Sequence, residues 1–247
     1  MEWPGVLLGV AHAPELTRNF SEQWLGAGNL VLLALLFPLV KALHEAGHGM
    51  ACKARGGEVH EAGLMLLAFY PVPYVDVSNT SALAGKWQRA LVGAAGMLAE
   101  LWVAGLAFYL WLALEPGLAR SIAYNVAVLA SVTTLFFNAN PLLRYDGYYI
   151  LADVIEIPNL AQRAGRQWQY WAERFAFGVR QAEPPAATAG ERRWFFWYAP
   201  LSFAYRLFVS LAIAAFVAQQ FFVIGVLLAV WTVALSVFWP LFKGLRA

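Results

Sequence analysis

Two histidines and a glutamate lie close together in the segment KALHEAGHGM, residues 41 to 50. His44 and His48 are four residues apart, so on an α-helix their imidazoles lie near one face and can share a zinc ion. Glu45, between them, can act as a general base toward a metal-bound water. The preceding run, NLVLLALLFPLV, carries no charge. Ionisable groups at membrane depth are costly, so we expect these three residues to be functional.

A catalytic zinc site needs a third protein ligand, because three ligands leave one coordination position open for water. The candidates in or beside apolar segments are few: His60, Asp76, Glu100, Asp146 and Asp153. Asp146 is favoured because it follows an apolar segment that returns to the side of the membrane where the histidines lie. In FFNANPLLRYDGYYILAD, residues 136 to 153, we expect Pro141 and Gly147 to break the helix. Broken backbone at membrane depth is tolerated where it lines a wet or buried cavity.

Other polar residues nearby have a structural interpretation beside a chemical one. Cys52 follows His48 by four residues, and we favour a small buried residue over a fourth metal ligand. His60 beside Glu61 is interpreted as a surface pair. Glu100 is an isolated carboxylate in an apolar segment, for which we favour structural hydrogen bonding over catalysis. Lys41, one turn before Glu45, either perturbs that carboxylate or extends to the membrane surface, and the sequence does not decide between these.

The composition indicates that lipid surrounds much of the chain. Of its 247 residues, 61% are hydrophobic and 13% are charged, whereas soluble domains carry roughly 25% charged residues. The net charge of +2 gives no reason to expect a nucleic-acid partner. We therefore predict an all-α polytopic membrane protein, with the lipid bilayer as its main partner. Windows of about 20 residues indicate five transmembrane helices, at about 25 to 48, 88 to 114, 122 to 137, 201 to 218 and 221 to 242.

This pattern divides the chain into four parts. They are an N-terminal tail (1–24), a metalloprotease core of three spans (25–153), an interfacial amphipathic helix with a linker (154–199) and a C-terminal helical hairpin (200–247). Most of the 17 lysines and arginines fall on the side where the first span ends. Basic loops are typical of the cytoplasmic side. We therefore expect an integral membrane protein with its active site near the cytoplasmic side.

Residues 63 to 79, GLMLLAFYPVPYVDVSN, predict a small membrane-associated β-hairpin around a Pro-Val-Pro turn. We expect its free strand edge to hold an extended substrate, with Tyr74, Val75 and Val77 at the contact. The alternative is that the hairpin only caps the end of the helix bundle. Residues 160 to 178 predict a basic amphipathic helix in the membrane interface.

The order His44-Glu45-Ala46-Gly47-His48, then Asn138-Ala139-Asn140-Pro141, then Asp146-Gly147 resembles the site-2 protease family of intramembrane zinc metalloproteases. The family pattern is HExxH on the first core helix and N-x-x-P-x-x-x-x-D-G on the third. The resemblance covers about residues 25 to 153, and NPLLRYDGYY is most similar to bacterial peptide zinc metalloproteases. The chain departs from the family at GMLAE, residues 96 to 100, where the family often has Gly-Pro followed by Ala-Asn.

The resemblance implies His44, His48 and Asp146 as ligands of Zn2+ and Glu45 as the base. It also implies that Asn138 positions the substrate near the metal. Asn138 and Asn140 have a second interpretation, in which they only cap the broken helix.

The function expected from these residues is that of an intramembrane zinc endopeptidase. Its substrate would be a membrane protein or a membrane-delivered peptide, and adaptor or secretion partners are possible. The alternative is a non-proteolytic zinc-binding subunit of a peptide-processing or secretion assembly, against which the retained Glu45 argues. A transporter with a midplane ion site is disfavoured, because the chain lacks two related halves.

Overall fold

The computed structural model describes residues 27 to 238 except 68, 84, 177 and 179 to 183. The expected N-terminal tail and the end of the fifth span lie outside these described residues. The chain forms two compact units, Met1–Val154 and Ile155–Ala247. Each unit is described by itself.

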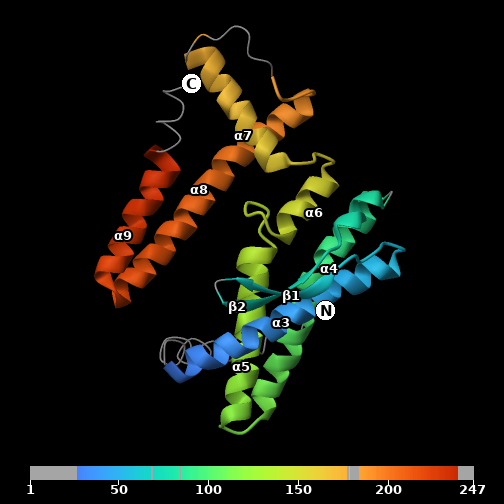
Figure 1. Cartoon of the computed structure of the whole chain (residues 1–247), viewed down its shortest axis with the longest axis vertical. Coiled ribbons are helices and arrows are strands. Elements are labelled where there is room, and N and C mark those ends of the chain that lie inside the picture. The colour runs from blue at the N-terminus through green and yellow to red at the C-terminus, as the bar shows by residue number, and fades with distance from the viewer. Residues whose placement is uncertain (1–26, 68, 84, 177, 179–183, 239–247) are drawn as a thin grey trace, which may run out of the picture. The chain divides into compact units, whose positions relative to one another are not determined.

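The first unit is built on long apolar helices with a small hairpin between the first two (Figure 1). Its elements in chain order are α3 (Ala27–Ala54), β1 (Ala62–Leu67), β2 (Tyr70–Val75), η1 (Ser78–Ala82), α4 (Lys86–Ala113), α5 (Leu118–Val132), η2 (Thr133–Asn138) and α6 (Asp146–Val154). The helix α4 packs against α3, α5 and α6. Because α3 and α6 both pack against α4, this helix positions the histidines of α3 and the aspartate of α6.

A glycine allows α3 to pack closely against α4. A Cβ atom at Gly47 of α3 would lie 2.8 Å from the carbonyl oxygen of Ala95, so no larger residue fits without moving the helix. The end of α4 is set by Glu115-Pro116-Gly117, since proline cannot continue a helix. The short connection makes α4 and α5 neighbours that run in opposite directions.

The third apolar segment ends in a broken helix, as expected, but the break differs in detail. The helix α5 continues into the π-helical η2, residues 139 to 145 leave the helix, and α6 begins at Asp146. Pro141 lies in the break, whereas Gly147 lies inside α6, so the prediction that Gly147 breaks the helix is wrong. A Cβ atom there would meet the carbonyl oxygen of Ala139 at 2.5 Å. The glycine therefore lets the first turn of α6 pack against the break.

The hairpin is a two-stranded antiparallel sheet whose register pairs Ala62 with Val75 and Leu67 with Tyr70. The strands are joined at residues 68 and 69, so the prediction of a turn at Pro-Val-Pro is wrong, and those residues lie within β2. The N–H of Asp76 donates to the carbonyl of Glu61 (2.8 Å). Because ladder positions alternate, Pro71 and Pro73 fall where the backbone nitrogen faces away from β1, and no ladder bond is lost.

The second unit is also helical. Its elements are α7 (Leu160–Trp171), η3 (Ala172–Ala176), α8 (Ala189–Gln220), α9 (Phe222–Val233) and η4 (Ala234–Phe238). The helix α7 buries Leu160, Ala164 and Gln167. Phe175, in η3, is exposed.

The helix α8 begins inside the segment that was expected to be a flexible linker. Thr188 caps it by accepting a hydrogen bond from the N–H of Glu191 (3.2 Å). Thr-x-x-Glu is the pattern of a capping box, so this start was visible in the sequence. Just before it, the N–H of Ala186 donates to the buried side chain of Gln167 (3.0 Å).

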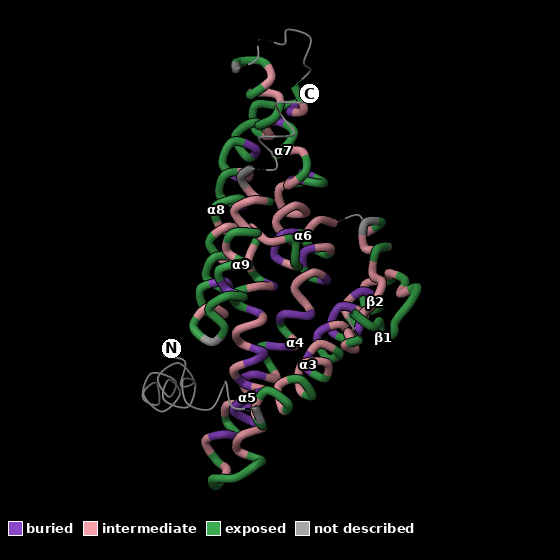
Figure 2. The backbone as a smooth tube through the Cα atoms, turned by 60° about the vertical axis from the view of Figure 1, so that its left-hand side comes forward, coloured by how far each residue is buried: buried purple, intermediate pink, exposed green. Residues whose placement is uncertain are grey.

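Four described helices are long and apolar enough to cross a membrane: Gly28–Ala54, Lys86–Ala113, Leu118–Asn138 and Ala189–Gln219. The fifth expected span corresponds to a shorter apolar helix, Phe222–Ser236, within the described residues. Many large hydrophobic side chains on these helices are exposed, as the green stretches of Figure 2 show for α8 and α9. Such extensive apolar surface is typical of contact with lipid rather than water.

Candidate metal centre

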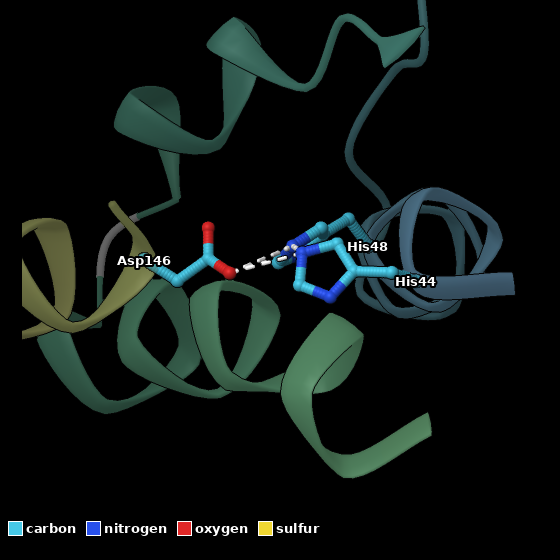
Figure 3. Close-up of side chains that lie close together, drawn as sticks. All are labelled: His44, His48 and Asp146. Carbon is cyan, nitrogen blue, oxygen red and sulfur yellow. Dashed lines mark hydrogen bonds and ion pairs between the residues drawn. The ribbon is translucent and has the colours of Figure 1, made fainter. Parts of the chain in front are cut away.

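His44, His48 and Asp146 come together in the first unit, with their side chains pointing toward one another (Figure 3). The Nε2 atom of His44 lies 3.0 Å from Nε2 of His48 and 3.0 Å from Oδ2 of Asp146. Nε2 of His48 lies 3.5 Å from the same carboxylate oxygen. One helical turn of α3 therefore supplies two imidazoles, and the first residue of α6 supplies the carboxylate.

Gly96 of α4 provides the room for this cluster. A Cβ atom at this position would lie 2.4 Å from Nε2 of His48 and 2.8 Å from Nε2 of His44. Any side chain there would displace the imidazoles. Gly96, the first residue of the GMLAE stretch, therefore faces the candidate metal site itself.

Hydrogen bonding shows which nitrogen of His48 is free to bind a metal. Its Nδ1 atom lies 2.8 Å from the carbonyl oxygen of Val92. A carbonyl oxygen can only accept, so Nδ1 carries the proton and Nε2 presents a lone pair to the cluster. This is the arrangement in which protein histidines bind metals.

The cluster is incompletely hydrogen-bonded. Among the described residues, Oδ2 of Asp146 and Nδ1 of His44 are buried without a hydrogen-bond partner. Burial by itself raises the pKa of Asp146, but the two imidazoles outweigh burial and hold that pKa below its usual range, so the group is a carboxylate. Nitrogen atoms of two imidazoles and an oxygen of one carboxylate thus face a common point. Buried groups of this kind require a cation.

The size of the cluster fits zinc. Zinc binds imidazole nitrogen and carboxylate oxygen at about 2.0–2.2 Å in tetrahedral geometry, so its ligand atoms lie about 3.3 Å apart. The three separations of 3.0, 3.0 and 3.5 Å bracket that value. Three ligands would leave the fourth position open, as in catalytic rather than structural zinc sites.

Glu100 adds a second buried carboxylate beside the cluster. It is fully buried, and its Oε1 atom lies 2.6 Å from Nζ of Lys41 and 3.4 Å from Nδ1 of His44. With Glu45 and Asp146 it makes three carboxylates against the single ammonium group of Lys41. The ionised set carries a net charge of −2, which a divalent cation would neutralise. Such neutrality matters most in a low-dielectric setting.

Glu45 faces a groove between α3 and the hairpin. Its Oε2 atom accepts a hydrogen bond from the N–H of Val75 (3.2 Å). The groove has a volume of about 760 Å³ and is lined by Glu45, Gly49, Leu64, Tyr74 and Val75 among others. The three metal-ligand candidates are not among the described residues that line it. Glu45 lines the groove and is adjacent in sequence to the ligand candidate His44. It therefore links the groove to the metal cluster.

The two asparagines and Val77 have other contacts. Asn138 is buried, and its Nδ2 atom donates to Oε2 of Glu100 (3.1 Å). Oδ1 of Asn140 accepts from the N–H of Leu142 (2.9 Å), which caps the broken backbone. Val77 follows the end of β2 and precedes η1, so it is not part of the strand edge that was expected to contact substrate.

The remaining candidates do not join the cluster. Asp153 pairs with Arg89 (3.0 Å), and Cys52 is buried against the carbonyl of Glu58 (Sγ to O, 3.6 Å). The imidazole of His60 is half exposed beside Glu58.

Sequence reasoning did not find the partnership of Lys41 with Glu100, which are 59 residues apart. A signal was present, since each is an isolated ionisable group of opposite sign in an apolar segment, and such groups usually pair.

The fold and the cluster define a helical, apolar protein with a candidate site for a divalent metal. The chain is similar to the "Putative peptide zinc metalloprotease protein YydH" of Bacillus subtilis (strain 168), with 23% identity over 163 residues. That match covers 66% of this chain and 63% of the YydH protein, so the chain spans less than two thirds of its length. No family model and no solved structure matches the chain.

Proposed function

We propose that the protein is an intramembrane zinc endopeptidase of the site-2 protease type, which hydrolyses peptide bonds of membrane-embedded or membrane-delivered peptides. The observation that carries the proposal is the cluster of His44, His48 and Asp146 with Glu45 next to a ligand on the same helix. The similarity to a protein named as a peptide zinc metalloprotease supports it. The distribution of basic residues supports a site near the cytoplasmic side, and the similarity to a protein of Bacillus subtilis supports a bacterial inner membrane.

His44, His48 and Asp146 would hold the zinc ion and keep it at the contact of α3, α4 and α6. When bound, zinc lowers the pKa of a coordinated water and polarises the carbonyl of the scissile bond. Glu45 takes the proton of the attacking water and later delivers it to the leaving amine. The bond from the N–H of Val75 holds its carboxylate toward the groove, where a peptide can reach it.

The hairpin beside the groove is the proposed guide for the substrate. A helical substrate hides its carbonyl groups, so it must be extended before cleavage. Ala62, Leu64 and Leu66 of β1 alternate with the ladder positions, so their N–H and C=O groups face away from β2. These groups have no hydrogen-bond partner among the described residues. An extended peptide could pair with them as an added strand.

This assignment moves the substrate edge from β2 to β1. The outer edge of β2 has Pro71 and Pro73, which carry no N–H, and the N–H of Val75 is used by Glu45. Tyr74 and Val75 remain as walls of the groove. Val77 has no role in the edge, and a substrate contact by Asn138 stays a proposal.

Glu45→Gln tests the mechanism, because the amide keeps the shape and removes the proton acceptor. We expect the purified variant to hold zinc at the level of the unsubstituted protein, measured by mass spectrometry of the metal. We also expect it to lose the peptides that the active protein releases from membranes, measured by peptidomics of cells expressing each form.

The exposed Glu58→Gln is the matched control and should behave as the unsubstituted protein. Equal release of the same peptides by Glu45→Gln would refute the proposed mechanism. Full zinc content without any released peptide in either form would favour the non-proteolytic alternative.

A further inference from the structure

The carboxylate of Glu100 is held by groups from two other segments. Oε1 pairs with Nζ of Lys41 on α3 at 2.6 Å. Oε2 accepts hydrogen bonds from the hydroxyl of Thr134 and from Nδ2 of Asn138 (3.1 Å), both in η2, and Oγ1 of Thr133 lies 3.4 Å away. The group is fully buried, so its position is determined by these donors rather than by solvent.

One of the two carboxylate oxygens also faces a metal-ligand candidate. Oε1 lies 3.4 Å from Nδ1 of His44, and that nitrogen has no hydrogen-bond partner among the described residues. The other nitrogen of the ring, Nε2, lies 3.0 Å from Oδ2 of Asp146. The imidazole of His44 therefore lies between two carboxylates, one on the side of the cluster and one behind it.

The two histidines need the same tautomer but have different acceptors behind them. A ring whose Nε2 binds a metal must carry its proton on Nδ1. For His48, the acceptor of that proton is the carbonyl of Val92 (2.8 Å). For His44, the nearest acceptor is Oε1 of Glu100. A carboxylate behind a ligating imidazole fixes the ring orientation and increases the basicity of the ligand.

An ion pair with Lys41 alone would not explain this arrangement. Glu100 could satisfy Lys41 from any rotamer that reaches the ammonium group. The donors on η2 restrict it to the position in which Oε1 also faces His44. Lys41 offsets the charge of the carboxylate, which would otherwise be costly at this depth.

We propose that Glu100 is a positioning residue for the metal site, which accepts the Nδ1 proton of His44 and so orients Nε2 toward the metal. Lys41, Thr134 and Asn138 hold Glu100 in place for this role. The inference rests on the proposed zinc site and adds a residue to it that the HExxH and Asp-Gly motifs do not contain.

The test uses the full chain purified in detergent, titrated with zinc against a competing chelator and with Co2+ by visible absorption. Glu100→Leu combined with Lys41→Met removes both charges and the acceptor behind His44, and leaves no buried ion unpaired. We expect this double variant to bind zinc about 10- to 100-fold more weakly, as is typical when the outer partner of a ligating histidine is lost. We also expect a shifted Co2+ absorption band, because the ring of His44 is no longer held.

Asn29→Ala with Asn125→Ala is the matched control, since it removes another polar contact between α3 and a neighbouring helix. It should leave zinc affinity and the Co2+ band unchanged. Unchanged affinity and band in the Glu100→Leu and Lys41→Met double variant would overturn the inference while the zinc site stands. Absence of zinc binding by the unsubstituted protein would overturn the proposed site as well, so the two failures are distinguishable.

A second measurement applies if the double variant does not fold. In zinc-loaded protein labelled with 15N at histidine, the proposal requires a downfield, exchange-protected Nδ1 proton on His44, bonded to a carboxylate. An Nδ1 proton of His44 that exchanges rapidly with water would overturn the inference without any substitution.

Discussion

Two polar contacts between α3 and its neighbouring helices differ in how they are completed. Near the start of α3, Asn29 and Asn125 exchange side-chain hydrogen bonds of 3.2 and 2.8 Å, and Asn125 also donates to the carbonyl of Ser121 (2.8 Å). This pair is neutral. Each amide finds its partner within the pair or the adjacent backbone.

The second contact lies about two to four turns before the end of α3 and remains incomplete. Lys41 and His44 face Glu100, while His44 and His48 face Asp146. Polar atoms there have no hydrogen-bond partner among the described residues, and the carboxylates outnumber the ammonium group. A polar contact that only joins two helices satisfies itself, as the asparagines do. A polar contact with unpaired polar atoms and an unbalanced charge at a common point indicates that a ligand binds there.

The strongest way to break this comparison is to remove a ligand from the incomplete contact. We expect Asp146→Ala to bind zinc more than about 100-fold more weakly, since even outer-shell changes cost about 10- to 100-fold. Asp153→Asn is the control on the same helix, because Asp153 pairs with Arg89 rather than with the histidines. Metal analysis after dialysis measures both. Full zinc content in Asp146→Ala would show that another residue is the third ligand.

A second test alters the space around the incomplete contact without touching a polar group. Gly96→Ala places a Cβ atom 2.4 Å from Nε2 of His48, so we expect zinc affinity to fall by about 10-fold or more, as when a ligand is misoriented. Gly105→Ala on the same helix meets no described atom within 4 Å. It should leave zinc affinity unchanged and stabilise α4 by about 0.5–1 kcal/mol.

Chelator competition and thermal unfolding separate the two glycine variants. Equal zinc affinity in Gly96→Ala and Gly105→Ala would mean that the imidazoles do not occupy the positions described here.

A third test addresses the contact between Asn29 and Asn125. Asn125→Ala leaves the amide of Asn29 without its partner, which costs about 1–3 kcal/mol in the free energy of unfolding. Zinc affinity should not change, because the pair contributes no group to the metal cluster. Unfolding in denaturant, followed by helical circular dichroism, measures the loss. A drop in zinc affinity larger than the drop in stability would contradict the separation of the two contacts.

The difference between these contacts also explains what could be predicted from the sequence. The spacing of His44 and His48 follows from helical geometry, and Asp146 followed from its place after an apolar segment. Glu100 could be recognised as anomalous but not assigned, because its partners depend on how α3 and η2 pack against α4. The hairpin turn was misplaced because Pro-Val-Pro is typical of turns, whereas here the register places both prolines on a strand edge.

The smallest expected effect concerns the edge of β1, where backbone groups lack a hydrogen-bond partner among the described residues. Leu64→Pro removes one outward N–H and leaves the ladder to β2 intact, since Leu64 lies opposite Pro73 at a position without ladder bonds. We expect zinc content and stability to be retained. One lost hydrogen bond to substrate contributes about 0.5–1.5 kcal/mol, so peptide release should fall by about 2- to 12-fold.

Met65→Pro is the matched control, because the N–H of Met65 faces Val72 in the ladder and its loss should disrupt the hairpin. Unchanged peptide release in Leu64→Pro, measured by the same membrane peptidomics, would leave the hairpin as a cap of the helix bundle rather than a clamp for substrate.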